Sequence, residues 1–262
     1  MIDGIYLSTA GGLVQEAKHS VIADNVANAN TPGFKKQHLM FETRLAEAMM
    51  RDRSLPADLP LTSAGGTWIA ESVTDFTQGT LSATDNPLDM AIQGEGFFTV
   101  TDGREKLYTR AGTFALDAQG RLTTAGGKYL VLDDSGHPIT LKGEEINITR
   151  SGAIFTRTAG EVSQAGKIGL VTFKELKEKL PGLSRILERA GGGNLRYRGS
   201  DVLPAEGTVH QGFIEQSTVN IVEEMAAMIQ CYRAFEANMQ AIRAQDSALQ
   251  RAVTQVGRVS PR

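Results

Sequence analysis

The chain contains a single cysteine, Cys231, among its 262 residues. One cysteine excludes an intrachain disulfide and a cluster of thiolate metal ligands. The histidines are far apart in the sequence, and none has a second histidine four residues away, as helical zinc sites require. They are His19, His38, His137 and His210. The sequence therefore predicts no disulfide and no metal site.

Long apolar runs and an excess of one charge are also missing. No stretch reaches the roughly eighteen apolar residues of a transmembrane helix. The 27 basic and 30 acidic residues nearly cancel, to a formal charge of −3, and no basic run with interleaved aromatic residues occurs. Nucleic acid is therefore not an expected partner. The N-terminus lacks a basic stretch followed by an apolar core, so composition alone favours a cytoplasmic protein over a secreted one.

Motifs for catalysis and cofactor binding are absent as well. The Gly-Glu-Gly sequence at 94–96 begins like a dinucleotide loop, but Thr99 stands where the third glycine belongs. The Gly-Gly-Lys at 126–128 lacks the other residues of a phosphate loop, and no Gly-x-Ser-x-Gly occurs. We therefore expect no catalytic residue, no cofactor and no small-molecule substrate. A pair of carboxylates far apart in the chain, as in a glycosidase, stays open.

The C-terminal end carries an apolar repeat of seven. One row consists of Ile221, Met228, Phe235, Ile242, Leu249 and Val256. The second row consists of Met225, Tyr232, Met239, Asp246 and Val253. The rows interleave at spacings of four and three, as the a and d positions of a coiled coil do, and only Asp246 interrupts them. The pattern predicts a long helix with a partner helix. The core face of an ordinary helical bundle is the alternative, but it needs more helices than this chain offers.

The N-terminal end offers the partner helix. Residues 5–29 contain no proline, and apolar residues recur there at spacings of three and four. They are Leu7, Ala10, Val14, Ala17 and Val21. The Asn-Thr-Pro-Gly sequence at 30–33 ends the helix. The C-terminal helix is longer, so we expect neighbouring subunits to cover the rest of its seam.

Three asparagines lie where the N-terminal seam becomes polar. They are Asn25, Asn28 and Asn30. One interpretation is that their amides bond a neighbouring backbone and fix the register of helix packing, as buried asparagine does in coiled coils. The other is that they are solvated groups at the end of the helix. The sequence leaves both open.

Between the helices the pattern changes. Residues 36–50 have helical spacing and predict a short helix, and 53–66 predict a loop. Beyond about residue 67, turns with early Asp and late Gly separate strand-like stretches. These are 107–116, 121–125, 128–132, 145–149, 153–157 and 166–173. Such spacing predicts an antiparallel sandwich or a barrel-like domain. Residues 174–190 return to helical composition, and 191–212 resemble an irregular glycine-rich linker.

Together these patterns predict an α+β protein. Long N- and C-terminal helices would form a coiled-coil-like stem, with a central antiparallel β-rich domain between them. The expected divisions are 1–35 for the first helix and its motif, 36–66 for a variable helix or loop segment, 67–212 for the β-rich domain with its linker, and 213–262 for the heptad helix.

Four segments resemble, in the same order, the signature sequences of the flagellar rod and hook protein family. They are 25–35, Asn-Val-Ala-Asn-Ala-Asn-Thr-Pro-Gly-Phe-Lys; 86–98, which starts Asn-Pro-Leu-Asp; 108–120, which starts Tyr-Thr-Arg-Ala-Gly-Thr-Phe; and a pattern spread over 212–238. Val26 and Thr218 depart mildly from the family pattern. The length and the single central domain resemble the rod proteins more than the longer hook protein, and distal and proximal rod proteins are not separated.

The resemblance implies a structural subunit of the bacterial flagellar basal-body rod, which is not an enzyme and polymerises into a helical drive shaft. Such proteins leave the cell through the flagellar type III export apparatus without a cleaved signal, which replaces the cytoplasmic expectation with a periplasmic one. The implied partners are further copies, other axial proteins such as rod and hook subunits, the export apparatus and, as an open alternative, the surrounding ring proteins. Nucleic acid and small-molecule substrates are not implied.

We expect the assembly interface to include the polar asparagines and the apolar seam residues. They are Leu7, Val14, Val21, Asn25, Asn28, Asn30, Ile221, Met225, Met228, Tyr232, Phe235, Met239, Ile242, Leu249, Val253 and Val256. Residues 36–66 match the family least and are the expected place of contacts that distinguish one paralogue from another. Two other functions stay open: a closed homo-oligomeric binding module, and an enzyme that acts on cell-wall glycan.

Overall fold

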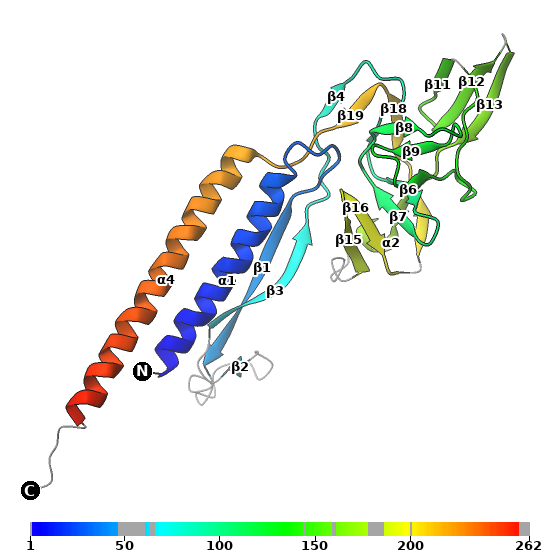
Figure 1. The fold of residues 1–262 in the computed structure, drawn as a ribbon. Coiled ribbons are helices and arrows are strands. Elements are labelled where there is room, and N and C mark those ends of the chain that lie inside the picture. Colours follow the sequence, from blue (N-terminus) through cyan, green and yellow to red (C-terminus); the bar gives the residue numbers. More distant parts are fainter. Residues whose placement is uncertain are drawn as a thin grey trace, which may run out of the picture. The chain divides into compact units, whose positions relative to one another are not determined.

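The computed structural model of the chain describes residues 2–46, 61–62, 66–143, 145–158, 161–177, 186–199 and 201–256 (Figure 1). The chain divides into two compact units. The helical unit combines Met1–Ala27, Gln37–Val73 and Asn220–Arg262, and the β unit combines Asn28–Lys36 with Thr74–Val219.

Two helices dominate the helical unit. Helix α1 spans Ile2–Ala27 and helix α4 spans Ile221–Val256, and the two lie side by side in opposite directions (Figure 1). Asn220 caps α4, because its Oδ1 accepts a hydrogen bond from Val222 N at 3.1 Å. Glu223 and Glu224 in the first turn also suit the positive end of the helix dipole. The two predicted terminal helices are therefore confirmed, whereas a coiled-coil stem is not.

A small sheet completes the helical unit. Its strands are β1 (Gln37–Ala46), β2 (Leu61–Thr62) and β3 (Gly66–Thr74), in the order β2-β1-β3. The short helix predicted at 36–50 is therefore wrong over 37–46. Pairing with two other strands satisfies the backbone of β1, and such tertiary context overrides weak helical spacing. Residues 47–60 and 63–65, which cover most of the predicted loop, lie outside the described residues.

The β unit is built from sixteen short strands and one short helix in the described part of the chain. In chain order these are β4 (Leu81–Ala83), β5 (Met90–Gln93), β6 (Phe97–Thr101), β7 (Lys106–Thr109), β8 (Phe114–Leu116), β9 (Leu122–Thr124), β10 (Leu130–Val131), β11 (Glu145–Ile148), β12 (Ala153–Thr158), β13 (Glu161–Lys167), β14 (Leu170–Phe173), α2 (Lys174–Lys177), β15 (Leu187–Gly191), β16 (Asn194–Tyr197), β17 (Val202–Pro204), β18 (Thr208–Gln211) and β19 (Phe213–Glu215).

These strands form several antiparallel sheets. The largest follows the order β15-β16-β7-β6-β10-β9-β8, and β14 joins it by pairing with β6 and β17. Separate sheets contain β11-β12-β13, β18-β5 and β19-β4. The predicted central antiparallel β-rich region is confirmed. The irregular linker predicted at 191–212 is wrong, because β16, β17 and β18 lie within it.

The predicted turn chemistry is present at both Asp-Gly turns. Asp117 Oδ1 accepts hydrogen bonds from the backbone N–H groups of Gln119 and Arg121 at 2.9 and 2.8 Å. Asp133 Oδ1 does the same for Ser135 and His137 at 2.9 and 2.7 Å. Both carboxylates accept hydrogen bonds from the backbone of their own turns, which supports the turn interpretation of both aspartates.

Candidate assembly interface

Helices α1 and α4 meet along a polar seam in antiparallel heptad register. A β-carbon added at Gly4 would lie 2.9 Å from Gln245 Nε2, and one added at Gly11 would lie 3.2 Å from Asn238 Nδ2. Each step of seven along α1 therefore matches a step of seven back along α4. The two glycines leave room for amide side chains to lie directly on the α1 backbone.

The same register continues toward the other end of α1. Cys231, seven residues before Asn238, is buried and its Sγ lies 3.0 Å from Gln15 O. Burial raises the pKa of the Cys231 thiol, against a smaller opposite effect of Lys18. One heptad further, Glu224 meets Asn25. The inner seam of α4 is thus Glu224, Cys231, Asn238 and Gln245.

Only one of the two predicted heptad rows of α4 lies on the inner side. Met228, Phe235, Ile242 and Leu249 are half-buried. Ile221, the first residue of the same row, is exposed. In the other row Met225 and Tyr232 are 54 % and 56 % exposed, Asp246 and Val253 are exposed, and Met239 is half-buried. The second row of α4 that does face α1 is the inner seam of Glu224, Cys231, Asn238 and Gln245. Each of its members precedes a member of the second predicted row by one residue. The second predicted row therefore does not lie on the inner seam of this chain, and its role in assembly stays a prediction.

The predicted α1 residues divide in the same way. Val14 is buried and Val21 half-buried, whereas Leu7 is exposed together with Tyr6 and Leu13. The side chain of Val256, at the end of α4, lies outside the described residues. The chain therefore uses part of the predicted set internally and leaves Leu7, Ile221, Met225, Tyr232 and Val253 outward.

The side-chain amide of Asn25 joins three elements of the helical unit, and we name its hydrogen bonds with Gln37 and Glu224 the clasp. Its Nδ2 donates to Gln37 O at 2.9 Å and to Glu224 Oε2 at 3.2 Å, and its Oδ1 accepts from Gln37 N at 3.0 Å. The side chain is only 1 % exposed, so the interpretation of a solvated amide is wrong for Asn25. The clasp ties the end of α1 to the start of α4 and the start of β1.

Asn28 and Asn30 have different surroundings in the β unit. Asn28 Oδ1 accepts from Thr31 Oγ1 at 3.3 Å, and Asn28 O accepts from Thr31 N at 3.1 Å, so Asn28 closes a turn. Asn30 is exposed. A role of either amide in the register between copies stays a prediction.

The β unit contains a buried ionic cluster that the sequence did not reveal. Lys35 Nζ lies 2.5 Å from Glu215 Oε1 and donates to Thr77 O at 2.6 Å. Arg110 Nη1 lies 3.4 Å from Glu215 Oε2, and Gly79 N donates to Glu215 Oε1 at 2.8 Å. Burial lowers the pKa of Lys35 and of Arg110, while the Glu215 carboxylate opposes both shifts. We name Lys35, Arg110 and Glu215 the ionic cluster.

The family-like motifs converge on this cluster. Gly33 has φ of +69°, and a β-carbon there would lie 2.3 Å from the carbonyl carbon of Arg110. Phe34 is buried beneath the guanidinium of Arg189, whose Cζ lies 4.2 Å from the ring centre. These motif residues therefore hold the β unit together. The only signal in the sequence was the presence of charged residues within apolar motifs.

Metal binding and membrane spanning find no support in the described residues. Among them, no group of three or more His, Cys, Asp or Glu side chains is arranged to hold a metal ion. Within the same residues, no helix is both long and apolar enough to cross a membrane.

Comparison with known proteins gives consistent matches along the chain. Residues 14–35 match the family described as flagella basal body rod protein, 91–168 match the flagellar hook protein FlgE/F/G D1 domain, and 210–255 match the flagellar basal body rod FlgEFG protein C-terminal region.

Individual relatives are similar over nearly their whole length. The flagellar basal-body rod protein FlgG of Buchnera aphidicola subsp. Schizaphis graminum is 33 % identical over 96 % of this chain and 98 % of its own. In Caulobacter vibrioides, FlgG is 34 % identical, covering 93 % and 95 %, and the rod protein FlgF is 32 % identical, covering 90 % of each. The resemblance to rod proteins is confirmed, and this chain belongs to the flagellar basal-body rod protein family as a structural subunit of the rod.

Proposed function

We propose that this rod subunit polymerises through the outward faces of its two terminal helices, α4 of one copy packing on the terminal helices of its neighbours. The family places the chain in the flagellar basal body, where rod proteins assemble with other axial proteins. What the proposal adds is the surface that makes the contacts.

The observation that carries the proposal is an apolar stripe on the exposed side of α4. Val222, Met225, Ile229 and Tyr232 follow one another at spacings of three, four and three, and all four are more than half exposed. We name these four residues the outer stripe. The spacing is that of a heptad seam, now on the side away from α1. Contiguous exposed apolar side chains of this kind mark interaction sites on soluble proteins.

The energy of one such contact is modest. Fully burying a large apolar side chain contributes about 1.5–3 kcal/mol, so the partly exposed outer stripe contributes on the order of 5 kcal/mol. Association costs about 4–15 kcal/mol in lost freedom. One helix contact therefore does not hold two free subunits together, whereas contacts with several neighbours at once do. This balance favours soluble monomers that add to a growing polymer.

The inner seam makes the outer stripe available. Glu224, Asn238 and Gln245 lie on the side of α4 that faces α1. The apolar residues of the outer stripe are therefore not buried within the chain and stay available to neighbouring copies. An outer stripe that meets a different surface on its neighbour gives a heterologous contact, which extends into a filament unless the rotation closes. Leu7, Tyr6 and Leu13 on α1 offer such a second apolar surface.

The proposal also covers the route to the rod. We expect the chain to pass through the flagellar type III export apparatus and to assemble in the periplasm. In cells without that apparatus, the chain should stay with the cytoplasmic fraction, which fractionation and immunoblotting measure. Its appearance in the periplasm of such cells would contradict this route.

Substitution within the outer stripe tests the assembly surface. The full-length double variant Met225→Asp with Tyr232→Asp places two charges in the proposed contact. We expect seeded growth, followed by light scattering and electron microscopy, to be lost while the circular dichroism spectrum is kept. Gln230→Asp, on an exposed polar position of the same helix, is the matched control and should still grow.

Two outcomes would contradict the proposal. Undiminished growth of the double variant would show that the outer stripe is not the contact surface. A discrete oligomer of the unaltered chain at every concentration, without open-ended growth, would instead support the closed homo-oligomer.

A further inference from the structure

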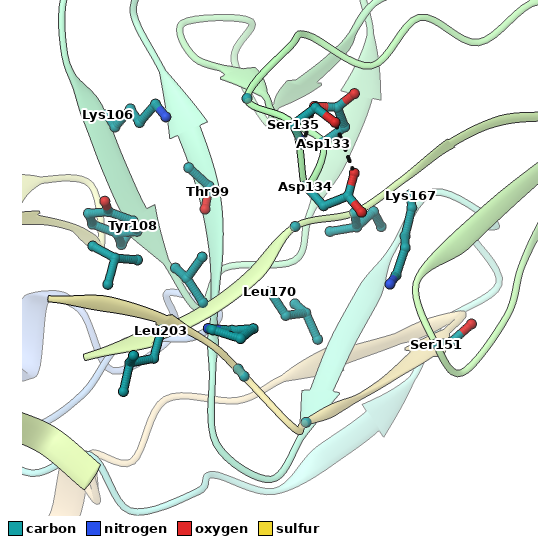
Figure 2. A pocket seen from close by; sticks show the side chains of 18 residues that line it. Thr99, Lys106, Tyr108, Asp133, Asp134, Ser135, Ser151, Lys167, Leu170 and Leu203 are labelled. Carbon is teal, nitrogen blue, oxygen red and sulfur yellow. Dashed lines mark hydrogen bonds between the residues drawn. The ribbon is translucent and has the colours of Figure 1, made fainter. Parts of the chain in front are cut away.

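Two pockets of the β unit differ in the side chains that line them. The larger, of about 640 Å³, is lined by strands β6, β7, β14 and β17 and the turn at 133–136 (Figure 2). Its lysines, Lys106 and Lys167, are balanced by Asp133 and Asp134, so its charges favour no particular occupant. The smaller has a volume of about 460 Å³, within the range of pockets that hold ligands. We name this smaller pocket the amide pocket.

The lining of the amide pocket is nearly uncharged. Lys128 is the only charged side chain among the described residues that line it. Its Nζ lies 5.0 Å from the ring centre of Tyr129, and Asp102 attracts the same ammonium group. Alanines and glycines at 125 and 190–192 make up much of the rest. The lining therefore suits a neutral occupant.

A buried amide in the wall of the amide pocket lacks a partner. Asn194 is 5 % exposed, and its side chain makes no hydrogen bond with any residue that the structure describes. An asparagine amide can donate two hydrogen bonds and accept two. A buried amide without partners is unfavourable, because it has lost water and gained nothing in return. Asn194 therefore calls for an occupant that both donates and accepts hydrogen bonds.

The clasp shows what an asparagine amide binds in this chain. Asn25 donates to Gln37 O and accepts from Gln37 N, so a side-chain amide and backbone amide groups satisfy each other. The amide of Asn194 is open to similar pairing from outside the chain, because Gly192 has no side chain to cover it. A β-carbon added at Gly192 would lie 3.8 Å from Asn194 Nδ2. The pocket therefore fits an amide that approaches past Gly192.

Gln164 presents a free amide elsewhere on the β unit. It lies on β13, the longest strand described in this unit and an edge strand, which in the described sheet pairs only with β12. Gln164 is exposed, and its amide makes no hydrogen bond within the described residues. Its neighbours Ser163 and Ala165 are small, and the pairing with β12 is irregular at Ala165. Such an irregularity re-aims side chains at a sheet edge, so Gln164 can enter a pocket without bulky neighbours.

We infer that Gln164 of one copy inserts into the amide pocket of a second copy and pairs with Asn194 there. The Gln164 amide donates to Asn194 Oδ1 and accepts from Asn194 Nδ2, so each amide gains the partner that it lacks. The nearly uncharged lining accepts this neutral side chain without burying an ion. The inference rests on the proposed polymerisation and adds a contact between β units to the contact between helices.

The two partners of this contact are different surfaces of the same unit. An edge strand that meets a pocket is a heterologous contact, and each docked copy still offers a free Gln164 or a free amide pocket. The contact therefore propagates from copy to copy, as a rod requires.

Removal of either amide tests the contact. Full-length Asn194→Leu and Gln164→Leu should each slow seeded elongation about five- to tenfold, because two hydrogen bonds between copies are lost. Neither should lower Tm, since neither amide has a partner within the described chain. Asn147→Leu makes the same change at an exposed position outside the pocket. This matched control should elongate as fast as the unaltered chain.

The double variant tests whether the two amides meet. Asn194→Leu with Gln164→Leu should elongate no more slowly than the slower single variant, because the second substitution removes a contact that is already lost. A double effect equal to the product of the two single effects would mean that the residues act separately, and would overturn the pairing.

Cross-linking in assembled rods locates the contact. Full-length Ala125→Cys, at the exposed rim of the amide pocket, and Ser163→Cys, beside Gln164, are expressed together in place of the unaltered chain. Recovered rods are oxidised and run on a non-reducing gel, and the buried native Cys231 should not react. We expect a cross-linked dimer from the mixture and none from either variant alone. Asn147→Cys, on the other edge strand of the same sheet, replaces Ser163→Cys in the control mixture and should give none.

The outcomes separate this inference from the proposed function. Rods that give no dimer above the control mixture, normal elongation without either amide, or a lower Tm of Asn194→Leu would overturn the amide contact and leave the helix contact standing. N-acetylglucosamine serves as a probe for a glycan site. If it shifts the NMR signals of the Asn194 amide while Gln164→Leu elongates normally, the amide contact is overturned as well. If even the unaltered chain forms no rods, the proposed polymerisation fails.

Discussion

Substitution of Glu215 should destabilise the β unit more than substitution of either cation beside it. The ionic cluster holds two cations and one carboxylate, all buried. Glu215→Gln removes the carboxylate that contacts both Lys35 and Arg110. The carboxylates of Asp75 and Glu95 attract these cations more weakly. Breaking a buried pair in this way costs about 3–5 kcal/mol. Lys35→Met leaves the Arg110–Glu215 pair and mainly orphans the carbonyl of Thr77, at about 1–3 kcal/mol.

Combining the two substitutions sharpens the prediction. Lys35→Met with Glu215→Gln leaves one cation, Arg110, without its carboxylate partner instead of two. We therefore expect the double variant to cost about as much as Glu215→Gln alone, about 3–5 kcal/mol, and clearly less than the sum of the single effects. Thermal unfolding followed by circular dichroism measures this. At about 2–4 °C per kcal/mol, Glu215→Gln should lower Tm by roughly 10 °C.

The same cluster gives a pH dependence of known sign. Burial lowers the pKa of Lys35 below 10.5, so between the lowered value and 10.5 the unfolded chain binds more protons than the folded chain. The free energy of unfolding contributed by Lys35 therefore rises with pH through that window. Tyr197, whose pKa is raised to about 12, acts in the opposite direction above its ordinary value. Subtracting the Lys35→Met profile from that of the unaltered chain isolates Lys35.

Three results would refute this reasoning. The first is an equal loss of Tm in Lys35→Met and Glu215→Gln. The second is a loss of stability in the double variant that equals the sum of the two single losses. The third is a contribution of Lys35 to the free energy of unfolding that falls as the pH rises. Glu236→Gln, which changes an exposed acidic residue in the helical unit, controls for the loss of one acidic charge.

Three further substitutions test the packing described above. Gly112→Ala should prevent the β unit from folding, because its β-carbon would lie 1.5 Å from Met90 O. Gly103→Ala, in open space at φ of +88°, should cost only about 1 kcal/mol. Soluble yield and Tm of the two variants measure the difference. Asn25→Leu should destabilise the helical unit by about 2–4 kcal/mol, because Gln37 N and O and the Glu224 carboxylate lose their hydrogen bonds to its amide. The control Asn30→Leu, at an exposed position, should cost little. Thermal melting of the helices at 222 nm distinguishes the two variants, and equal melting temperatures would contradict the role of Asn25. Gly11→Leu should separate α1 from Asn238 and lower the helical melting temperature, whereas Leu13→Ala on the exposed side should not.

Local patterns predicted much of this fold. The two proline-free heptad segments both form helices in the structure, and the asparagine, proline and glycine at 30–33 end α1 close to where the structure ends it. Asp and Gly in the turns predicted the antiparallel strands. By contrast, β1 has side-chain spacing that suits a helix, and only its pairing partners and the Asn25 clasp decide otherwise.

The identity of the inner seam could not be predicted from apolar periodicity. Such periodicity selects the most apolar rows, and one of the two predicted rows of α4 does lie on the inner side. The row beside it on that side is polar in part and consists of Glu224, Cys231, Asn238 and Gln245. The available signal was on the other helix, where Gly4 and Gly11 stand seven residues apart and remove the side chains that would keep α4 at a distance. The ionic cluster is harder still to foresee, since Lys35 and Glu215 lie 180 residues apart in sequence.

The polar inner seam and the apolar outer stripe have one physical explanation. Two helices with apolar faces on both sides could pair within the chain through either face, and the outer stripe would then be buried before assembly. The hydrogen bonds of Asn25 with Glu224 and Gln37 are satisfied in only one register, because a slip of the helices would leave these buried polar groups without partners. Polar specificity inside the chain thus keeps its apolar side chains outward, where neighbouring copies supply the burial that the single chain cannot provide.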